Sequence, residues 1–320
     1  MIPRVRLAHL PTPVESLPCL SAFLGGPRLW VKRDDLTGIA FGGNKVRKLE
    51  LVLAEAQANG ARTLVTVGAA QSNHCRQTAA LAAHYGMVCI LVLSGDPSQA
   101  PSGNLLIDEL LGAEIVWTNR QDRSVVLQQT FNHAWESGRR PYLIPLGASN
   151  PLGTLGYMFA FEELLTQQVK PDWIVVASSS GGTQAGLVLG ARRASWKGRI
   201  LGISIDEKEA DLQEIVSHLA TEASDLAGQR MNFKPADILV NDDYLGGGYG
   251  VMGDLEKEAI LAFARQEGLL LDPVYTGRAA AGLIDLIRRG FFKARDTVLF
   301  WHTGGTPALF AGNYQADLIR

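Results

Sequence analysis

Cysteine is scarce in this chain: Cys19, Cys75 and Cys89 are the three present, and they are widely spaced. An odd number without a CxxC pair indicates reduced thiols in a cytoplasmic protein, and excludes a disulfide framework or a cysteine zinc site. Histidines and carboxylates also form no cluster with metal-ligand spacing, and no Ser/His/Asp spacing is typical of a hydrolase. The sequence therefore predicts a protein without a bound metal.

Long apolar runs and an excess of charge of one sign are missing as well. No apolar run approaches the length that spans a bilayer, and the first residues lack the charged-then-apolar pattern of a signal peptide. The formal net charge is −2, which provides no basic surface for nucleic acid. We expect a protein whose partner is a small molecule, not a membrane or a nucleic acid.

What the 320 residues do contain is a regular alternation of short apolar runs with helical segments. Continuous β-branched runs of this kind are typical of parallel strands buried on both faces, which predicts a doubly wound α/β fold. Residues 1–27 are expected to be an irregular lead-in. The predicted strands are 29–32, 63–67, 88–93, 114–117, 142–145, 173–177, 200–205 and 297–301. The predicted helices are 48–59, 77–84, 105–111, 153–168, 183–194, 255–267 and 279–289.

A turn-rich segment, LGASNP at 146–151, is a candidate boundary between two sheets. It predicts a small α/β domain over 46–145, inserted into a larger domain made of 1–45 and 146–320. The strand at 29–32 would then belong to the larger sheet.

The segment FGGNKVRKLE at 41–50 joins a predicted strand to a predicted helix. Its two glycines permit a tight turn, and Asn44 is a good helix cap. Lys45 then lies near the positive end of the helix dipole, which disfavours the ammonium form and favours a nucleophilic amine. An exposed lysine in a solvated loop is the alternative interpretation.

A second glycine-rich segment, SSSGGTQAG at 178–186, follows one buried strand and begins a helix. Backbone amides at a helix start, with serine and threonine hydroxyls, form an anion site of the size of a phosphate. The glycine spacing is neither GxGxxG nor a Walker loop. Asp206 ends the next strand, where a dinucleotide enzyme keeps its ribose-binding carboxylate. A nucleotide-binding site therefore remains an alternative interpretation of this segment. Tight strand-to-helix packing is the structural alternative.

Several other polar or aromatic segments also end strands or form loops. Gly68–His74 precedes a helix, which Ser72 and Asn73 would cap, and His74 alone indicates no catalyst. Tyr249 lies in a glycine loop and Tyr275 in DPVYTG (272–277), while HTGG (302–305) ends the last strand. Tyrosines in such loops are candidate acids, although most tyrosines are packing residues. In a doubly wound sheet these strand ends converge on one crevice.

A lysine in a Gly-Gly-Asn-Lys turn, together with a phosphate cradle and no metal site, suggests pyridoxal phosphate. The chain resembles the fold-type II pyridoxal-phosphate enzymes, specifically the D-cysteine desulfhydrase / 1-aminocyclopropane-1-carboxylate (ACC) deaminase family. The matching segments are KRDD (32–35), GGNKVRKLE (42–50), GAAQSNHCRQTAA (68–80), SSGGTQAGL (179–187), GYG (248–250), DPVYTG (272–277) and HTGG (302–305). The resemblance implies a tryptophan synthase β-like fold with the cofactor between two doubly wound sheets, and a homodimer.

The resemblance also implies roles for particular residues. Lys45 would form the Schiff base, Lys48 would help to hold the phosphate, and Asn73 would face the phenolic oxygen of the cofactor. Tyr249 and Tyr275 match the two active-site tyrosines. The remaining implied residues are Ser180, Gly181, Gly182 and Thr183 in the phosphate cradle, and Ser72, Asn73 and His74 in the loop that receives the substrate carboxylate.

Two positions discriminate within the family. The deaminases carry Glu after the tyrosine of DPVY, opposite the ring nitrogen of the cofactor. This chain has Thr276 there, which the resemblance implies would hydrogen-bond that nitrogen without supplying a charge. The deaminases also tend to have Gln where this chain has His74. Both departures favour the desulfhydrases. The expected reaction is α,β-elimination of D-cysteine to pyruvate, sulfide and ammonia, with Lys45 or a tyrosine assisted by Ser72 as the base. An L-cysteate sulfo-lyase and an ACC deaminase are the alternatives.

Two interpretations from other classes also fit part of the sequence. A nicotinamide-dependent dehydrogenase would use the Gly181 loop and Asp206, and would give Lys45 no role. A ligand-binding protein that has kept the fold would bind the cofactor without catalysis.

Overall fold

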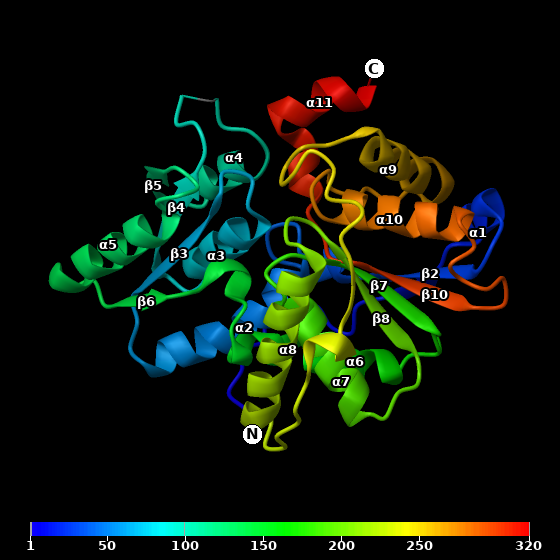
Figure 1. Ribbon diagram of the computed structural model, residues 1–320. Helices are drawn as coiled ribbons and strands as arrows, with labels where there is room; N and C mark the ends of the chain where they lie inside the picture. Colours follow the sequence, from blue (N-terminus) through cyan, green and yellow to red (C-terminus); the bar gives the residue numbers. More distant parts are fainter. Residues whose placement is uncertain (1, 99, 320) are drawn as a thin grey trace.

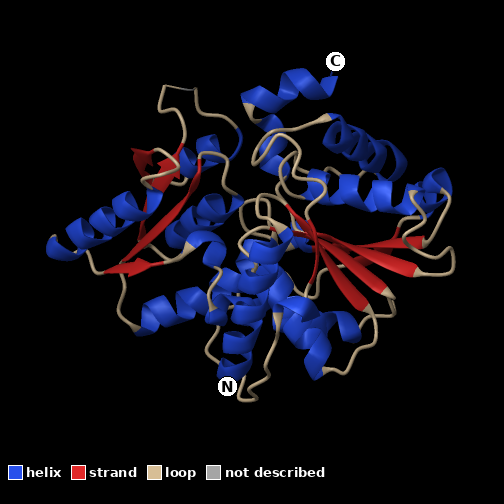
Figure 2. Ribbon diagram, viewed as in Figure 1, coloured by secondary structure: helices blue, strands red, loops and turns tan. Residues whose placement is uncertain are grey.

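The computed structural model describes residues 2–98 and 100–319. Two separate sheets, each with helices on both faces, form the molecule, and α2 lies between them (Figures 1 and 2). The predicted doubly wound α/β fold is confirmed. No helix in the described part of the chain is long and apolar enough to cross a membrane.

The larger sheet has six strands in the order β1-β2-β10-β7-β8-β9, and all neighbours are parallel except the antiparallel pair β1 and β2. Its strands are β1 (Val14–Ser16), β2 (Arg28–Arg33), β7 (Trp173–Ser178), β8 (Arg199–Ser204), β9 (Leu239–Asn241) and β10 (Thr297–His302). One face is covered by α1 (Pro18–Leu24), α9 (Asp254–Glu267) and α10 (Thr276–Arg288). The other face is covered by α6 (Pro151–Leu165), α7 (Gly182–Arg193) and α8 (Glu209–Leu226).

The smaller sheet has four parallel strands in the order β5-β4-β3-β6. Its strands are β3 (Thr63–Ala69), β4 (Val88–Ser94), β5 (Glu114–Thr118) and β6 (Pro141–Leu143). One face packs on α2 (Asn44–Ala58), α3 (Asn73–His84) and α4 (Gly103–Leu110), and the other on α5 (Arg123–Glu136). The chain ends with α11 (Gly312–Ile319), and short 3-10 helices η1 to η4 occupy Asp34–Leu36, Leu146–Ala148, Pro235–Asp237 and Thr306–Phe310. The proposed domain boundaries at 45/46 and 145/146 stay a prediction.

The lead-in expected over residues 1–27 is wrong, because it contains β1 and α1. Both elements are short, and β1 exists only through its antiparallel pairing with β2. The sequence prediction also missed α5, α8, α11 and the edge strand β9. In α5 only Ala134 is fully buried, so its apolar residues do not form one buried stripe and the sequence shows no clear helical period.

A buried carboxylate joins the end of β2 to α2, α6 and β10. Asp34, just after β2, is fully buried and accepts five hydrogen bonds. The donors are Thr12 Oγ1 (2.8 Å), Arg47 Nη2 (2.8 Å) and Nε (3.0 Å), Tyr157 OH (2.6 Å) and Trp301 Nε1 (2.8 Å). Burial opposes the charge, but Arg47 and the other donors hold the pKa of Asp34 below its usual value. Because Arg47 belongs to α2, this cluster fixes the helix that carries Lys45.

A second buried carboxylate predicts a pH dependence of stability. Asp108 on α4 is fully buried, and neither oxygen has a partner among the described residues. Burial raises the pKa of Asp108 to about 8, with Arg76 opposing the shift and Glu109 adding to it. In the unfolded chain the group titrates at ~3.9, so the folded state holds this proton more tightly. The contribution of Asp108 to the free energy of unfolding therefore decreases as the pH rises from about 4 to about 8.

We expect Asp108→Asn to remove this loss, because asparagine carries no charge. The variant should gain at least about 1 kcal/mol over the wild type between pH 5 and pH 8.5. Urea denaturation of both proteins at the two pH values measures the gain. If the free energy of unfolding changed by the same amount in both proteins between the two pH values, the raised pKa of Asp108 would be contradicted.

Candidate active site

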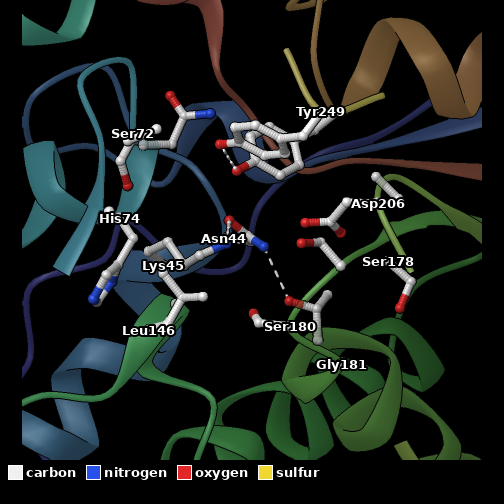
Figure 3. Close-up of a pocket in the computed structure, with 18 of the residues that line it drawn as sticks. Asn44, Lys45, Ser72, His74, Leu146, Ser178, Ser180, Gly181, Asp206 and Tyr249 are labelled. Atoms are coloured by element: carbon white, nitrogen blue, oxygen red, sulfur yellow. Dashed lines mark hydrogen bonds between the residues drawn. The ribbon is translucent and has the colours of Figure 1, made fainter. Parts of the chain in front are cut away.

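The predicted site residues converge on one pocket between the two sheets, at the carboxyl ends of their parallel strands (Figure 3). The predicted residues that line it are Lys45, Ser72, Asn73, His74, Ser180, Gly181, Thr183, Tyr249 and Tyr275. Lys48, Gly182 and Thr276 are not in the lining, but Lys48 Nζ donates to the carbonyl of Gly147, which is a lining residue. Gly182 and Thr276 each follow a lining residue in the chain, Gly181 and Tyr275. Their functional roles stay predictions.

Lys45 is the second residue of α2 and is partly buried. Its Nζ donates to Asn44 Oδ1 (3.0 Å), while Asn44 Nδ2 donates to Thr183 Oγ1 (3.0 Å), so one amide connects the lysine with the start of α7 (Figure 3). Burial lowers the pKa of Lys45 to about 8; Asp272 opposes this shift and Arg76 adds to it. The amine is therefore partly neutral near neutral pH.

Two details of the predicted lysine turn are corrected. The N-cap of α2 is Gly43, with φ of 121°, and Asn44 is the first helical residue, with its side chain turned to Thr183 instead of the helix end. The largest cause of the lowered pKa of Lys45 is burial, whereas the sequence suggested the helix dipole. Burial depends on the second sheet packing over the turn, which local sequence does not reveal.

The phosphate cradle lies between β7 and α7. The chain turns at Gly181 with φ of 76°, and α7 begins at Gly182. A Cβ atom at Gly182 would lie 2.8 Å from Lys48 Nζ and 2.8 Å from Ser149 Oγ, so any side chain there would fill the space next to these groups. The Gly182 N–H donates to the Ser180 carbonyl (3.0 Å), so the unpaired N–H groups of the helix start begin at Thr183, next to a small polar cavity that suits a phosphate.

Lys48 supplies the charge of this cradle. The side chain is fully buried, and Nζ donates to the Gly147 carbonyl (2.7 Å) and to Ser149 Oγ (2.7 Å). Within residues 2–98 and 100–319 it has no carboxylate partner. Burial and the nearby Lys45 hold the pKa of Lys48 well below its usual value. A buried ammonium without a counter-charge is unfavourable by itself, and a phosphate dianion beside it would supply that charge.

The start of α3 forms the opposite wall of the pocket. Ser72 is its N-cap, and Ser72 Oγ accepts from the backbone N–H of Cys75 (3.2 Å). Capping leaves the N–H groups of Asn73 and His74 as the first, unpaired donors of the helix. Both residues line the pocket, so this end of α3 is suited to a carboxylate.

The hydrogen bonds of His74 define its tautomer. Thr66 Oγ1 gives its only proton to the Ile144 carbonyl (2.8 Å), so its contact with His74 Nε2 (2.8 Å) requires Nε2 to carry a hydrogen. Burial, with Lys45 and Lys48 nearby, holds the pKa of His74 well below its usual value, and Nδ1 has no partner among the described residues. The neutral ring has no donor left for a carboxylate, which leaves that role to its backbone N–H.

The two predicted tyrosines form a pair. Tyr249 OH and Tyr275 OH lie 2.7 Å apart, with the rings edge to face. Burial is the largest cause that raises the pKa of both phenols above the usual value. Both phenols are therefore protonated at neutral pH. Since one hydroxyl donates to the other, the pair has one proton left to donate to a ligand.

Thr276 is fully buried at the first turn of α10. Its Oγ1 donates to Asp272 Oδ1 (2.7 Å) and accepts from the Asp272 backbone N–H (2.8 Å). The residue does not line the pocket in the described chain. A hydrogen bond from Thr276 to the ring nitrogen, as the resemblance implies, would require its hydroxyl to leave Asp272.

Sequence reasoning missed two arginines at the pocket mouth, Arg120 and Arg123, in and after the loop that follows β5. The guanidinium carbon of Arg120 lies 5.8 Å from the centre of the Tyr249 ring. Asp206 and Glu207, after β8, line the same pocket, and burial raises the pKa of Glu207. Neither arginine lies in a recognisable motif. No group of three or more possible metal ligands occurs among the residues that the structure describes.

Comparisons with known proteins agree on one family. The family model described as "Pyridoxal-phosphate dependent enzyme" matches residues 5–304. The structure is similar to that of an ACC deaminase homologue, with a TM-score of 0.92 and 38% identity over 99% of this chain and 96% of the other.

Two further similar structures have lower identity. A fungal L-serine ammonia-lyase from Rhizomucor miehei has a TM-score of 0.71 and 18% identity over 98% of both chains. The processed form of threonine deaminase isoform 2 from Solanum lycopersicum has a TM-score of 0.65 and 16% identity over 96% of this chain and 82% of the other. At these identities the likeness shows the fold alone.

The family match, the buried amine of Lys48 and the glycine cradle agree with the predicted cofactor, so the nicotinamide interpretation is set aside. This chain belongs to the pyridoxal-phosphate-dependent enzymes of fold type II, and pyridoxal phosphate is its cofactor.

Proposed function

We propose that this enzyme catalyses α,β-elimination on a small amino acid, with D-cysteine as the substrate and pyruvate, sulfide and ammonia as products. One observation carries the proposal: an amine of lowered pKa, a carboxylate-binding helix start and a pair of protonated tyrosines share the pocket that ends in the phosphate cradle.

The residues present fit the cofactor. Lys45 would hold it covalently, the cradle at residues 180–183 with Lys48 would hold its phosphate, and Asn73 would face its phenolic oxygen. When bound, pyridoxal phosphate withdraws electrons from the α-carbon of an amino acid, which makes the α-proton acidic.

The proton is taken by a residue of this chain, and the pKa values favour Lys45 over a tyrosine. A general base works best when its pKa is close to the operating pH. The pKa of Lys45 is about 8, whereas burial raises the pKa of Tyr249 and of Tyr275 above the ordinary phenol value. Lys45 Nζ therefore accepts the α-proton, and the tyrosine pair is suited to donate to the leaving sulfur.

Thr276 distinguishes elimination from opening of a cyclopropane ring. A threonine at this position supplies no negative charge to the ring nitrogen, and the Thr276 hydroxyl donates to Asp272 (2.7 Å), so the cofactor is a weaker electron sink than with glutamate. Elimination of a good leaving group needs less electron withdrawal than ring opening does.

We expect Thr276→Glu to lower elimination by at least about tenfold and to change the absorption of the cofactor. The new carboxylate would lie beside buried Asp272, which changes the charge next to the cofactor ring. Thr276→Val, which loses the hydroxyl without adding charge, is the matched variant. An unchanged spectrum in Thr276→Glu would place residue 276 away from the ring.

The test of the proposed reaction is a comparison of kcat/KM for D-cysteine, L-cysteine, L-cysteate and ACC on the reconstituted enzyme. D-Cysteine should give the highest value, with pyruvate and sulfide released in equal amounts. A highest value for ACC, with no sulfide from D-cysteine, would overturn the proposal and assign a deaminase.

L-Cysteate, which releases sulfite in place of sulfide, is a second candidate because of Arg120 and Arg123. Within the described chain neither guanidinium forms an ion pair with a carboxylate, and both line the pocket mouth. Guanidinium groups bind sulfonate and carboxylate oxygens well. If L-cysteate is the substrate, Arg123→Met should lower kcat/KM for it at least about tenfold and leave D-cysteine within twofold.

The phosphate role of Lys48 is tested by Lys48→Met. We expect affinity for pyridoxal phosphate to fall at least about tenfold, since a charged hydrogen bond is lost. Stability of the cofactor-free chain should change little, because burial and Lys45 already disfavour the charged form of Lys48 there. Equilibrium dialysis and urea denaturation measure the two effects, with Lys170→Met, at an exposed distant lysine, as the control. Unchanged affinity would contradict the assignment.

The homodimer and the cytoplasmic location also stay predictions. Sedimentation equilibrium of the purified enzyme and cell fractionation test them.

A further inference from the structure

Arg76 is a fully buried cation next to the pocket whose function none of the preceding assignments uses. It lies on α3, one turn after Asn73. Its Nη1 donates to Asn73 Oδ1 (3.2 Å) and to Asn104 Oδ1 (2.9 Å), and its Nη2 donates to the Gly42 carbonyl (2.8 Å). All three acceptors are uncharged, and no ion pair involves Arg76 in the part of the chain that the structure describes.

Asn104, at the start of α4, completes this arrangement. Its Oδ1 accepts from Arg76, and its Nδ2 donates to Asn73 Oδ1 (2.9 Å) and to the Gln71 carbonyl (2.8 Å). An arginine has only donors, so the Asn104 atom that faces Arg76 is the amide oxygen. A backbone carbonyl only accepts, so the Asn104 atom that faces the Gln71 carbonyl is the amide nitrogen, and the Asn104 amide therefore has one permitted orientation.

The same reasoning fixes the amide of Asn73. The atom between Arg76 Nη1 and Asn104 Nδ2 meets two N–H donors, so it is the carbonyl oxygen. The Nδ2 of Asn73 then has no acceptor among the described residues, and Asn73 lines the pocket. Asn73 is thereby set to donate a hydrogen bond to an anionic or phenolic oxygen, and flipping it would break both bonds.

The guanidinium also acts on Lys45 through its charge. The groups that influence Lys45 are Arg76 from α3, Asp272 before α10, Lys48 on α2 and the neutral His74. Arg76 is one cause of the lowered pKa of Lys45. Two carboxylates act in turn on Arg76: Asp272, and Asp108, whose own pKa burial raises to about 8.

We propose that Arg76 is a positioning residue with two effects: with Asn104 it holds Asn73 as a hydrogen-bond donor to the cofactor, and its guanidinium, which forms no ion pair within the described chain, adds positive charge near Lys45. The proposal rests on the cofactor and on the Lys45 assignment of the proposed function, and does not depend on which amino acid reacts.

A purely structural role is the competing explanation, because Arg76 also ties the Gly42 turn to α3. The two explanations differ in the role of Asn104, which bonds Arg76 and Asn73 but does not bond the Gly42 turn. If Arg76 only stabilises the turn, any Arg76 variant that still folds should have the cofactor spectrum of the wild type, with the same pH dependence.

The experiment uses the full chain and needs no turnover. The absorption of the lysine-bound cofactor is titrated with pH, and its dissociation constant is measured, for Arg76→Met, Arg76→Lys and Asn104→Leu. Thr78→Val is the control, because the hydroxyl of this buried threonine of α3 donates to the His74 carbonyl (2.9 Å) and, among the described residues, to no other group. Circular dichroism establishes that each variant folds, and Arg76→Gln replaces Arg76→Met if the latter does not.

The effect of the Arg76 charge and the positioning of Asn73 should appear in different measurements, the first in the spectral midpoint and the second in the affinity for the cofactor. Arg76→Met should raise the spectral midpoint by about one pH unit, while Arg76→Lys, which keeps the charge, and Asn104→Leu should stay within about 0.3 unit of the wild type. Asn104→Leu, Arg76→Lys and Arg76→Met should each weaken cofactor binding about tenfold.

A midpoint in Arg76→Met no different from Thr78→Val would overturn the electrostatic effect, and wild-type affinity in Asn104→Leu would overturn the positioning of Asn73. Failure of D-cysteine as a substrate would alter neither readout. A wild-type chain that binds no pyridoxal phosphate would overturn this proposal and the proposed function together.

Discussion

Replacing Lys45 by alanine should lower turnover by at least about a thousandfold. The side chain has two proposed tasks, holding the cofactor and accepting the α-proton, and the described pocket offers no second amine with the same exposure, because Lys48 is fully buried beneath the cradle. Steady-state release of pyruvate from D-cysteine measures the loss.

Lys170→Ala, at an exposed lysine outside the pocket, is the control and should keep wild-type turnover. Lys45→Ala should also still bind pyridoxal phosphate weakly, because the cradle with Lys48 is intact. Turnover within tenfold of the wild type in Lys45→Ala would refute the assignment of the base and of the attachment site.

Replacing Asp34 by asparagine should destabilise the folded chain by about 3–5 kcal/mol. Asparagine offers one acceptor oxygen where the carboxylate accepts five hydrogen bonds, and its NH₂ group would face donors of Arg47, Tyr157 or Trp301. Arg47 would keep only Glu163 as its charged partner, at 2.9 Å. Urea denaturation of the cofactor-free protein measures the change.

The matched control is Glu15→Gln, which also removes a carboxylate from an arginine. Glu15 pairs with Arg33 at 2.7 Å but is 44% exposed, so the loss should be below about 1 kcal/mol. Equal effects of the two substitutions would contradict the claim that the Asp34 cluster holds the start of α2.

Local sequence predicted the parts of the site that local chemistry determines. Gly181 needs a positive φ, Gly182 leaves room for Lys48, and Ser72 caps α3, so these segments carry a signal within a few residues. The alternation of buried strands with helices gave the fold class for the same reason.

The rest depends on contacts between residues far apart in the chain. Asn44 is a good cap by type, but Thr183, 139 residues away, takes its amide. The orientation of Asn73 depends on Asn104, 31 residues away, and the tautomer of His74 depends on the hydrogen bond from Thr66 to Ile144. No periodicity or motif contains these pairings, because each exists only once the sheets have packed.

Mapping the lysine that holds the cofactor tests the central claim most directly. The holoenzyme is reduced with borohydride, which makes the link between lysine and cofactor permanent, and is then digested and mapped by mass spectrometry. We expect the pyridoxyl group on Lys45, in the peptide that contains the Gly42–Glu50 segment. A label on Lys48 or on any other lysine, or no label at all, would contradict the site described for this enzyme.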